Sequence, residues 1–213
     1  MEERMVKFYS KDSNKLALHV IPGHFATSHS HINYYVDVTS LKTRASEAKE
    51  AAKVLFLHLP KTGFIDTIVC MDGTETIGAF LSQELEYGGV NTTNQHGTTY
   101  VVSPEINNNN QMLFRDNNKP AIEGKHIVLL LATATTGETI RRALECIRYY
   151  GGIVECVACL FSTIHEVENI PIDTLFDKED VLNYEAYSAN DCPFCKKGHR
   201  IEAMVNGFGY SKL

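Results

Sequence analysis

Residues 127–139 read IVLLLATATTGET, and this stretch decides the fold class. It begins with an unbroken aliphatic run, which is typical of a parallel strand buried on both faces. Small hydroxyl residues and Gly137 follow the run, and a helical pattern then extends over 139–150. The stretch therefore predicts a strand, a loop over 132–138 and a helix.

The same order of elements occurs elsewhere in the chain. Residues 65–71 form a short β-branched run that leads into a helical pattern over 77–86, and residues 153–161 supply a further strand. Residues 46–59 have apolar side chains at helical spacing. Continuous apolar strands that alternate with helices predict an α/β fold, with a mainly parallel sheet flanked by helices on both faces. Such folds bind ligands at the carboxyl ends of their strands.

The composition is that of a folded, acidic protein. Apolar residues make up 44% and charged residues 22% of the 213 residues, and the formal net charge is −6. This length predicts one domain, and the charge argues against a nucleic-acid or anionic-lipid partner. The charged N-terminus and the short aliphatic runs predict no secretory leader and no membrane span. A cytoplasmic protein with reduced cysteines is therefore expected.

The loop after the aliphatic run has the chemistry of a phosphate site. Backbone N–H groups at a helix N-terminus, hydroxyl donors and the positive end of the helix dipole all favour a bound phosphate. A strand-to-helix turn capped by threonines would use the same residue types, so both interpretations stay open. The candidate phosphate-binding residues are Thr133, Ala134, Thr135, Thr136, Gly137, Glu138 and Thr139.

Residues 127–139 resemble the phosphoribosyl-pyrophosphate (PRPP) signature of type I phosphoribosyltransferases. That signature has an aliphatic strand, two acids, two small residues, Thr-Thr-Gly, one further residue and then Thr or Ser. Residues 23–37, GHFATSHSHINYYVD, are similar to the N-terminal segment of orotate phosphoribosyltransferases. Residues 66–85 resemble the family's strand, diphosphate loop and helix, and residues 191–196, DCPFCK, resemble a tail of some members. The similarity follows the chain order over most of the sequence.

The resemblance implies a type I phosphoribosyltransferase fold as a single domain over 1–213, with an N-terminal hood segment over 1–45 and a peripheral C-terminal extension over 172–213. It implies an orotate phosphoribosyltransferase-like protein of pyrimidine nucleotide metabolism that binds a phosphorylated ribose or a nucleotide. The reaction would be glycosyl transfer from PRPP to a base, with Mg²⁺ bound when PRPP is bound. The family also implies a homodimer.

The resemblance also assigns candidate roles to residues outside the phosphate loop. The diphosphate loop would be formed by Asp72, Gly73, Thr74 and Glu75. The base side of the ligand would be contacted by His31, Tyr34 and Tyr35.

The sequence departs from the family pattern at the ribose and diphosphate positions. The two adjacent acids that hold the ribose hydroxyls in the family fall on Leu131 and Ala132, whose side chains accept no hydrogen bond. Asp72 and Glu75 would bring negative charge toward a diphosphate unless Mg²⁺ bridges them. These departures favour an alternative function, a non-catalytic nucleotide-sensing or regulatory protein on the same fold.

A catalytic cation is also missing where the family has one. The family's Arg-Lys pair is absent near residues 101–104, and the Asn-rich segment 107–118 that follows is interpreted as an exposed loop. Arg115 in this segment is the candidate substitute, and a solvated surface pair with Asp116 is the alternative.

The cysteines predict one candidate metal site. Cys192 and Cys195 have the Cys-x-x-Cys spacing that binds Zn²⁺, and His199 follows four residues on. A fourth ligand would come from His24, His29 or His31. A pair of reduced surface thiols is the alternative. Residues 156 and 159 are also cysteines, but their spacing on a predicted strand places them on opposite faces, where they cannot share a metal.

Overall fold

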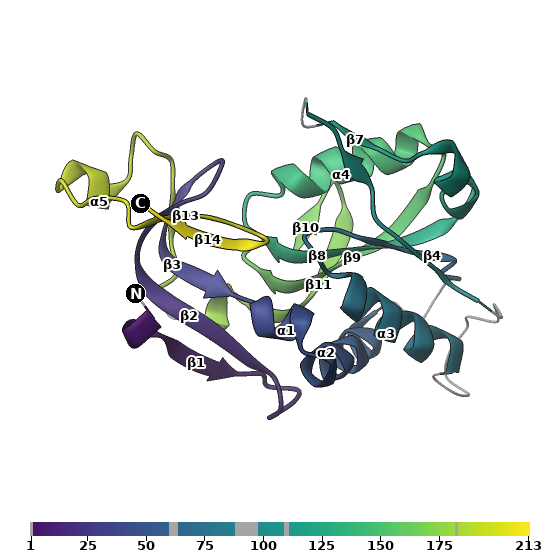
Figure 1. Ribbon diagram of the computed structural model, residues 1–213, viewed down its shortest axis with the longest axis horizontal. Coiled ribbons are helices and arrows are strands. Elements are labelled where there is room, and N and C mark those ends of the chain that lie inside the picture. The colour runs from purple at the N-terminus through teal and green to yellow at the C-terminus, as the bar shows by residue number, and fades with distance from the viewer. Residues whose placement is uncertain (1, 60–63, 88–97, 109–110, 182) are drawn as a thin grey trace.

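The computed structural model describes residues 2–59, 64–87, 98–108, 111–181 and 183–213. Two larger sheets lie side by side in Figure 1. One is a central sheet with helices on both faces, and the other is a smaller hood built from both ends of the chain.

The central sheet has the mainly parallel arrangement that the apolar runs predict. All of its neighbouring strands pair in parallel except β10, which pairs antiparallel to β11. In spatial order the strands are β10 (Glu166–Val167), β11 (Ile170–Asp177), β9 (Ile153–Ser162), β8 (His126–Ala134), β4 (Thr67–Cys70) and β5 (Tyr100–Val102).

Side chains that alternate along β8 face two separate apolar clusters. Val128, Leu130 and Ala132 share a cluster with residues of α2 (Ala45–His58) and α3 (Glu75–Tyr87). Leu129 and Leu131 share the other with residues of α4 (Glu138–Tyr149), on the opposite face of the sheet. Because both faces are covered, the strand carries no polar face, which explains its unbroken aliphatic sequence.

The helices and strands predicted around the signature are confirmed within a few residues, and one loop is shorter than predicted. β8 continues to Ala134, because Thr133 and Ala134 still pair with Phe161 and Ser162 of β9. Residues 132–134 therefore belong to the strand. Cys156 and Cys159 of β9 lie in different clusters, as their spacing on a strand requires.

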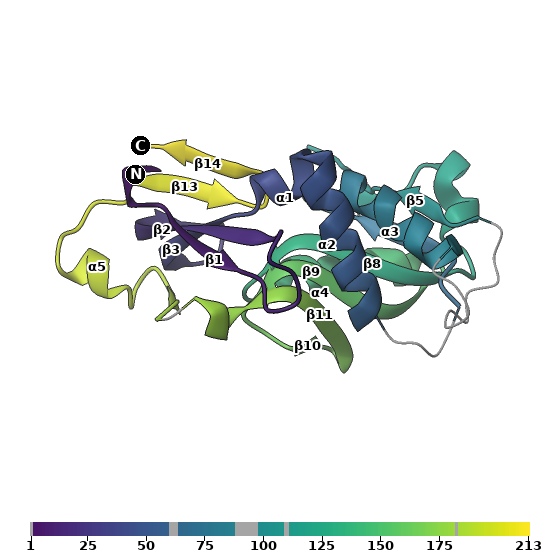
Figure 2. The same ribbon diagram turned by 90° about the horizontal axis from the view of Figure 1, so that it is seen from below.

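The hood combines residues from the two ends of the sequence. Its strands in spatial order are β12 (Ala186–Tyr187), β3 (His31–Asp37), β2 (Ala17–Ala26), β13 (Ala203–Asn206) and β14 (Gly209–Lys212), with β1 (Val6–Tyr9) also paired to β2. Figure 2 shows β13 and β14 lying over β1–β3, and α1 (Thr39–Thr43) leading from the hood to the helices of the central unit.

The C-terminal segment is more integrated than the sequence predicts. The expected peripheral extension begins at residue 172, yet residues 170–177 form β11 of the central sheet, and β12–β14 belong to the hood. β11 has a long partner on one side only, since β10 is a two-residue strand. Its burial is therefore mixed, and its sequence lacks the apolar run by which β4, β8 and β9 are recognised.

The Asn-rich segment is also more structured than the exposed loop that was predicted. A short hairpin joins β6 (Glu105–Ile106) to β7 (Met112–Leu113), and a 3₁₀ helix follows over Asp116–Ala121. Phe114 between them is 3% exposed and anchors the segment to the α4 side of the sheet. Residues 109 and 110 lie outside the described residues.

The remaining short elements are 3₁₀ helices at Glu2–Arg4 and Lys178–Asp180 and the helix α5 (Pro193–Lys196). No helix among the described residues is long and apolar enough to cross a membrane.

Candidate functional site

A cavity of about 210 Å³ lies between the hood and the carboxyl ends of β8 and β9. The central unit lines it with Asp72, Phe161 and residues 133–139. The hood contributes residues 27–29 and 205–209, and Tyr35 and Tyr184 also line it. The cavity thus has the position that ligand sites take in parallel α/β sheets.

The loop after β8 brings the start of α4 to the cavity wall. Gly137 is the N-cap residue of α4 and has a left-handed backbone with a φ of 79°. A Cβ at this position would lie 2.9 Å from Cγ2 of Val167, so both the backbone conformation and the space require glycine. The first N–H groups of an α-helix have no acceptor within the helix, and here they lie at the cavity. A threonine cap, the alternative interpretation of this loop, is not what the structure shows.

Neighbouring residues hold the loop in a fixed conformation. The Thr163 Oγ1 hydroxyl donates to the Thr135 carbonyl at 3.0 Å, and the Thr163 N–H donates to the Ala134 carbonyl at 2.9 Å. Arg141 Nη1 donates to Glu138 Oε1 at 2.7 Å and to the Thr136 carbonyl at 3.3 Å. The negative charge of Glu138 is therefore paired, and these contacts hold the backbone of the loop beside the cavity.

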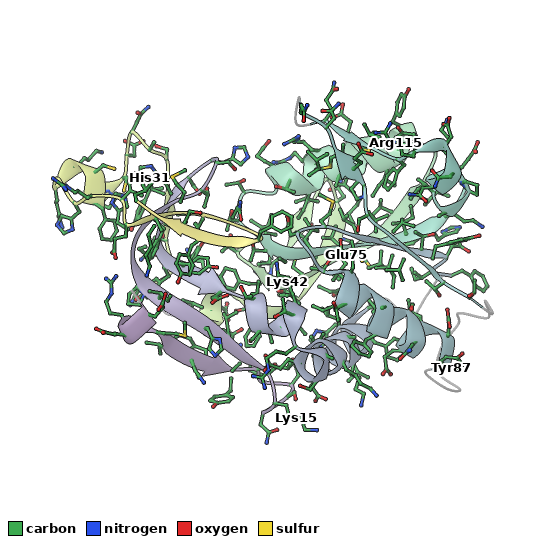
Figure 3. All side chains as sticks on the ribbon, viewed as in Figure 1. Lys15, His31, Lys42, Glu75, Tyr87 and Arg115 are labelled. Carbon is green, nitrogen blue, oxygen red and sulfur yellow. The ribbon has the colours of Figure 1, made fainter. Side chains whose placement is uncertain are left out.

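Asp72 is the member of the predicted diphosphate loop that lines the cavity. Burial raises the pKa of its carboxyl, while the Lys42 ammonium and a backbone hydrogen bond from Ala132 lower it by a smaller amount. Lys42 is itself buried and donates through Nζ to the carbonyls of Asp72, at 2.6 Å, and Gly207. This lysine, labelled on α1 in Figure 3, therefore joins α1 to the loop after β4 and to the turn between β13 and β14.

The turn between β13 and β14 is in close contact with Asp72. A Cβ on Gly207 would lie 2.6 Å from Cγ of Asp72, so glycine is required for this approach. The space beside the predicted diphosphate loop is therefore partly filled by the chain's own C-terminal hairpin.

The other residues of the predicted diphosphate loop do not line the cavity. Thr74 is buried, and its hydroxyl donates to the carbonyls of Met71 at 2.8 Å and Leu130 at 3.2 Å. Glu75 accepts from the Ser103 hydroxyl at 2.8 Å. Gly73 has a φ of 77° and shapes the turn.

The three residues predicted to contact the base lie in different parts of the structure. Tyr35 lines the cavity, where it is 4% exposed and packs edge-on against Phe25 and Tyr210. Tyr34 is partly buried against the core and does not line the cavity. His31 lies with His24 instead, in a separate cluster.

Sequence reasoning missed several residues of the cavity. His29 was considered only as a metal ligand, yet it lines the cavity from the turn between β2 and β3. Asn206 and Phe208 reach it from the C-terminal hairpin, which no local sequence pattern connects with the site.

The positions that correspond to the family's ribose-binding acids are part of the core. Leu131 and Ala132 are both 0% exposed and pack into the clusters on opposite faces of the sheet. Neither lines the cavity.

Arg115, the candidate substitute cation, also lies elsewhere. It forms a two-bond ion pair with Glu105, with Nε and Nη2 at 2.7 and 2.6 Å from the two carboxylate oxygens, and does not line the cavity. Asp116, the partner that the sequence suggested, pairs with Lys119 instead. Figure 3 shows Arg115 on the side of the molecule away from the hood. Within the described part of the chain, no residue lining the cavity is Lys or Arg.

Comparisons with known proteins agree with this architecture. The sequence is 22% identical over 187 residues to the orotate phosphoribosyltransferase of Chlorobium phaeobacteroides. The aligned region covers 86% of this chain and 88% of the relative. An adenine phosphoribosyltransferase structure from Thermoanaerobacter pseudethanolicus matches with a TM-score of 0.52 at 14% identity, over 82% of this chain and 96% of that one. The chain has the type I phosphoribosyltransferase fold.

Another phosphoribosyltransferase structure gives a similar match. The orotate phosphoribosyltransferase of Mycobacterium tuberculosis H37Rv, in complex with PRPP, has a TM-score of 0.51 at 12% identity, over 68% of this chain and 82% of that one. No family model matches the sequence. The phosphoribosyltransferase fold predicted from residues 127–139 is thus confirmed, at a sequence identity typical of a distant relative.

Proposed function

We propose that this protein binds a ribose 5′-phosphate ligand, a nucleoside monophosphate or PRPP, with the phosphate on the loop Thr135–Thr139. The observation that carries the proposal is the position of Gly137 and the first turn of α4 on the cavity wall. N–H groups, hydroxyls and the helix dipole act together there on an anion. The PRPP complex of the Mycobacterium tuberculosis structure supports this class of ligand.

Similarity to phosphoribosyltransferases supports transfer from PRPP as the kind of chemistry, in pyrimidine nucleotide metabolism. The reaction needs groups that stabilise the ribosyl cation and the departing diphosphate. Asp72 is the cavity carboxylate that could meet Mg²⁺ entering with the diphosphate. We further propose a cytoplasmic homodimer, as is usual for the resembling family.

The residues at the ribose positions and on the cavity wall favour a second function. The ribose-binding acids are replaced by two buried apolar residues, and within the described residues no cation lines the cavity. The phosphate loop needs neither group. A nucleotide-sensing protein that binds its ligand without efficient transfer is therefore the alternative that these residues fit better.

A 5′-monophosphate is expected to bind more tightly than the corresponding nucleoside. Uridine 5′-monophosphate at ~100 times its Kd should add about 2.7 kcal/mol to the free energy of unfolding, which a thermal-shift series detects. Uridine at the same concentration should add much less, because it has no phosphate to contact the loop. Equal shifts for the two compounds would show that the phosphate makes no contact and would refute the proposal.

Replacing Asp72 with Asn is expected to stabilise the protein at neutral pH and to strengthen monophosphate binding. Burial raises the pKa of the Asp72 carboxyl above its ordinary value of 3.8, so ionisation opposes folding at every pH above that raised pKa. Asn stays neutral, and like Asp it tolerates the left-handed backbone at this position, where φ is 56°. Removing one negative charge from the cavity wall should improve the affinity about tenfold, or ~1.4 kcal/mol.

The pH dependence provides the control for this variant. Its advantage in the free energy of unfolding should shrink as the pH falls through the raised pKa and disappear below pH 3.8, where Asp72 is protonated in the folded and the unfolded state. Urea unfolding of both proteins between pH 3 and 8 measures this difference. An advantage that is independent of pH would contradict the assignment of the cost to the Asp72 charge.

A further inference from the structure

Four potential metal ligands from distant parts of the sequence meet beside the hood. His24 lies on β2, His31 begins β3, Cys192 is the N-cap of α5, and Cys195 lies within that helix. One ligand atom from each of these side chains lies within 4.8 Å of the other three. Figure 3 shows His31 on the side of the hood that faces α5.

Four of the six separations between these atoms are close to the edges of a zinc coordination sphere, and the other two are within 4.8 Å. His24 Nε2 lies 3.2 Å from His31 Nδ1, 3.4 Å from Cys192 Sγ and 3.7 Å from Cys195 Sγ. His31 Nδ1 lies 3.3 Å from Cys195 Sγ. Tetrahedral Zn²⁺ with bonds of ~2.0 Å to nitrogen and ~2.3 Å to sulfur has ligand-to-ligand distances of roughly 3.3 to 3.8 Å.

The surroundings fix His24 in the orientation that a metal ligand needs. Its Nδ1 lies 3.1 Å from the His199 carbonyl and 3.2 Å from the Arg200 carbonyl, so Nδ1 carries the proton and Nε2 offers a lone pair. Phe194 stacks on the ring at 5.2 Å. His24 is 3% exposed and Cys192 is 0% exposed, so these ligands are shielded from water.

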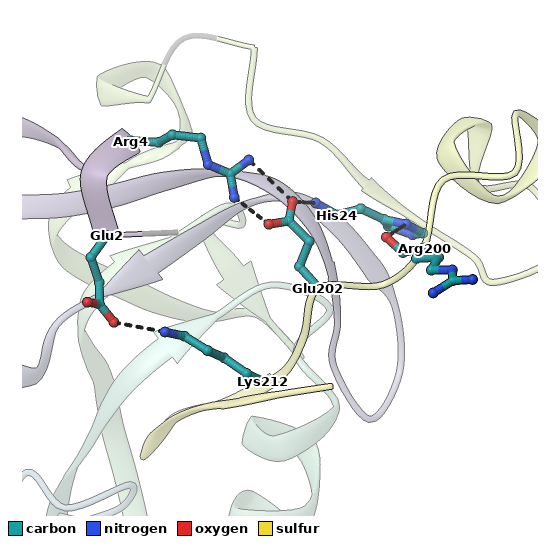
Figure 4. A network of polar contacts seen from close by, with 6 residues as sticks. All are labelled: Glu2, Arg4, His24, Arg200, Glu202 and Lys212. Atoms are coloured by element: carbon teal, nitrogen blue, oxygen red, sulfur yellow. Dashed lines mark hydrogen bonds and ion pairs between the residues drawn. The ribbon is translucent and has the colours of Figure 1, made fainter.

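A second set of contacts joins β2 to the C-terminal segment. The His24 N–H donates to Glu202 Oε1 at 3.3 Å, and Glu202 is paired with Arg4. Figure 4 shows this network around His24, together with the Arg200 contact. The β2 end of the cluster is therefore held to the C-terminal segment independently of any metal.

We propose that His24, His31, Cys192 and Cys195 bind a structural Zn²⁺ ion. The donor set of two thiolates and two imidazoles suits Zn²⁺ rather than Mg²⁺ or Ca²⁺, which prefer oxygen ligands. Four protein ligands complete a tetrahedron and leave no position for a substrate, so the ion has a structural role. The two thiols lose their protons to solvent when the metal binds.

The ion would connect the C-terminal segment to the β2–β3 hairpin. The turn of that hairpin carries residues 27–29 of the cavity wall, between the ligands His24 and His31. Metal binding would therefore stabilise the hood next to the ligand cavity without contacting the ligand.

Metal analysis of the 213-residue protein, purified without chelator, tests the proposal. Wild type is expected to contain about one zinc per chain, and His31→Asn and Cys195→Ser to contain less than one tenth of that amount. These two ligands are less buried than His24 and Cys192, so the variants should fold. The matched controls His29→Asn and Cys146→Ser change residues outside the cluster and should keep the full amount.

A spectroscopic measurement on wild type does not depend on the folding of any variant. Replacing zinc with Co²⁺ should give the visible absorption of tetrahedral cobalt with thiolate ligands, and Zn²⁺ should displace it. Chelation should also lower the unfolding temperature, and added Zn²⁺ should restore it. Equal zinc in wild type and Cys195→Ser would overturn the proposal. So would a wild-type protein that binds neither added Zn²⁺ nor Co²⁺.

Discussion

Thr139→Asp is expected to weaken the binding of uridine 5′-monophosphate at least 100-fold, or about 2.7 kcal/mol. Thr139 is the second residue of α4, follows the left-handed Gly137 and lines the cavity. A carboxylate at this position would occupy the region where the helix N-terminus attracts the phosphate, and the two negative charges would repel each other. Isothermal titration of wild type and variant measures the loss.

The fold should tolerate this substitution. An acidic residue in the first turn of a helix stabilises it by roughly 0.3–1 kcal/mol through the helix dipole. Gly137→Asp would be a poorer test, because any side chain there meets Val167 and imposes an unfavourable backbone conformation. Thr139→Asn is the matched control. It has nearly the same size as Asp but no charge, and should bind within about tenfold of wild type. Unchanged binding by Thr139→Asp would place the phosphate elsewhere.

Transfer of the phosphoribosyl group from PRPP to orotate is expected to be at least ~10⁴-fold slower than an ordinary enzyme turnover of about 10 per second. Each electrostatic contribution of the type that is missing here is commonly worth ~3–4 kcal/mol, or roughly 150- to 1000-fold in rate. Two are missing. Leu131 and Ala132 replace the acids, and Arg115 is engaged with Glu105 away from the cavity.

A coupled assay with PRPP, orotate and Mg²⁺ measures this rate, with the Chlorobium phaeobacteroides enzyme as the positive control. Phosphate binding must be shown on the same preparation, so that an inactive sample is not mistaken for an inactive site. A turnover between ~1 and 1000 per second would show that other residues supply the missing stabilisation and would contradict this expectation.

The central sheet could be predicted because its signals are local. A strand covered on both faces needs a continuous apolar run, and each covering helix needs apolar residues at helical spacing. The alternation along β8 also explains why Leu131 and Ala132 belong to opposite faces of the core. The strands that were missed, β5, β10 and β11, lie at the sheet edges or next to one, where burial no longer leaves so clear a pattern.

The hood could not be predicted in the same way, because its pairing is between distant segments. Ala203 of β13 pairs with Phe25 of β2, and nothing in either segment specifies the other. The turn at Gly207 and its contact with Asp72 follow from that pairing. The cavity residues on the C-terminal hairpin were therefore missed.

The sequence indicated which residue types gather around Cys192 and Cys195, but not which histidines. His199, expected beside the two cysteines, is not part of the cluster and meets His24 through its backbone carbonyl instead. His24, His29 and His31 were equivalent candidates in the sequence. The register of β2 and β3 shifts between Pro22 and Phe25, and such irregularities change the direction of side chains. His24 and His31 face Cys192 and Cys195, whereas His29 lies in the turn at the cavity.

A crystal structure of the protein with uridine 5′-monophosphate tests the central claim most directly. The phosphate should lie within hydrogen-bond distance, ~2.7–3.2 Å, of backbone nitrogens in residues 136–139, with the ribose directed toward Asp72 and the hood. A nucleotide whose phosphate lies away from this loop in the crystal, with the loop itself unoccupied, would contradict the account.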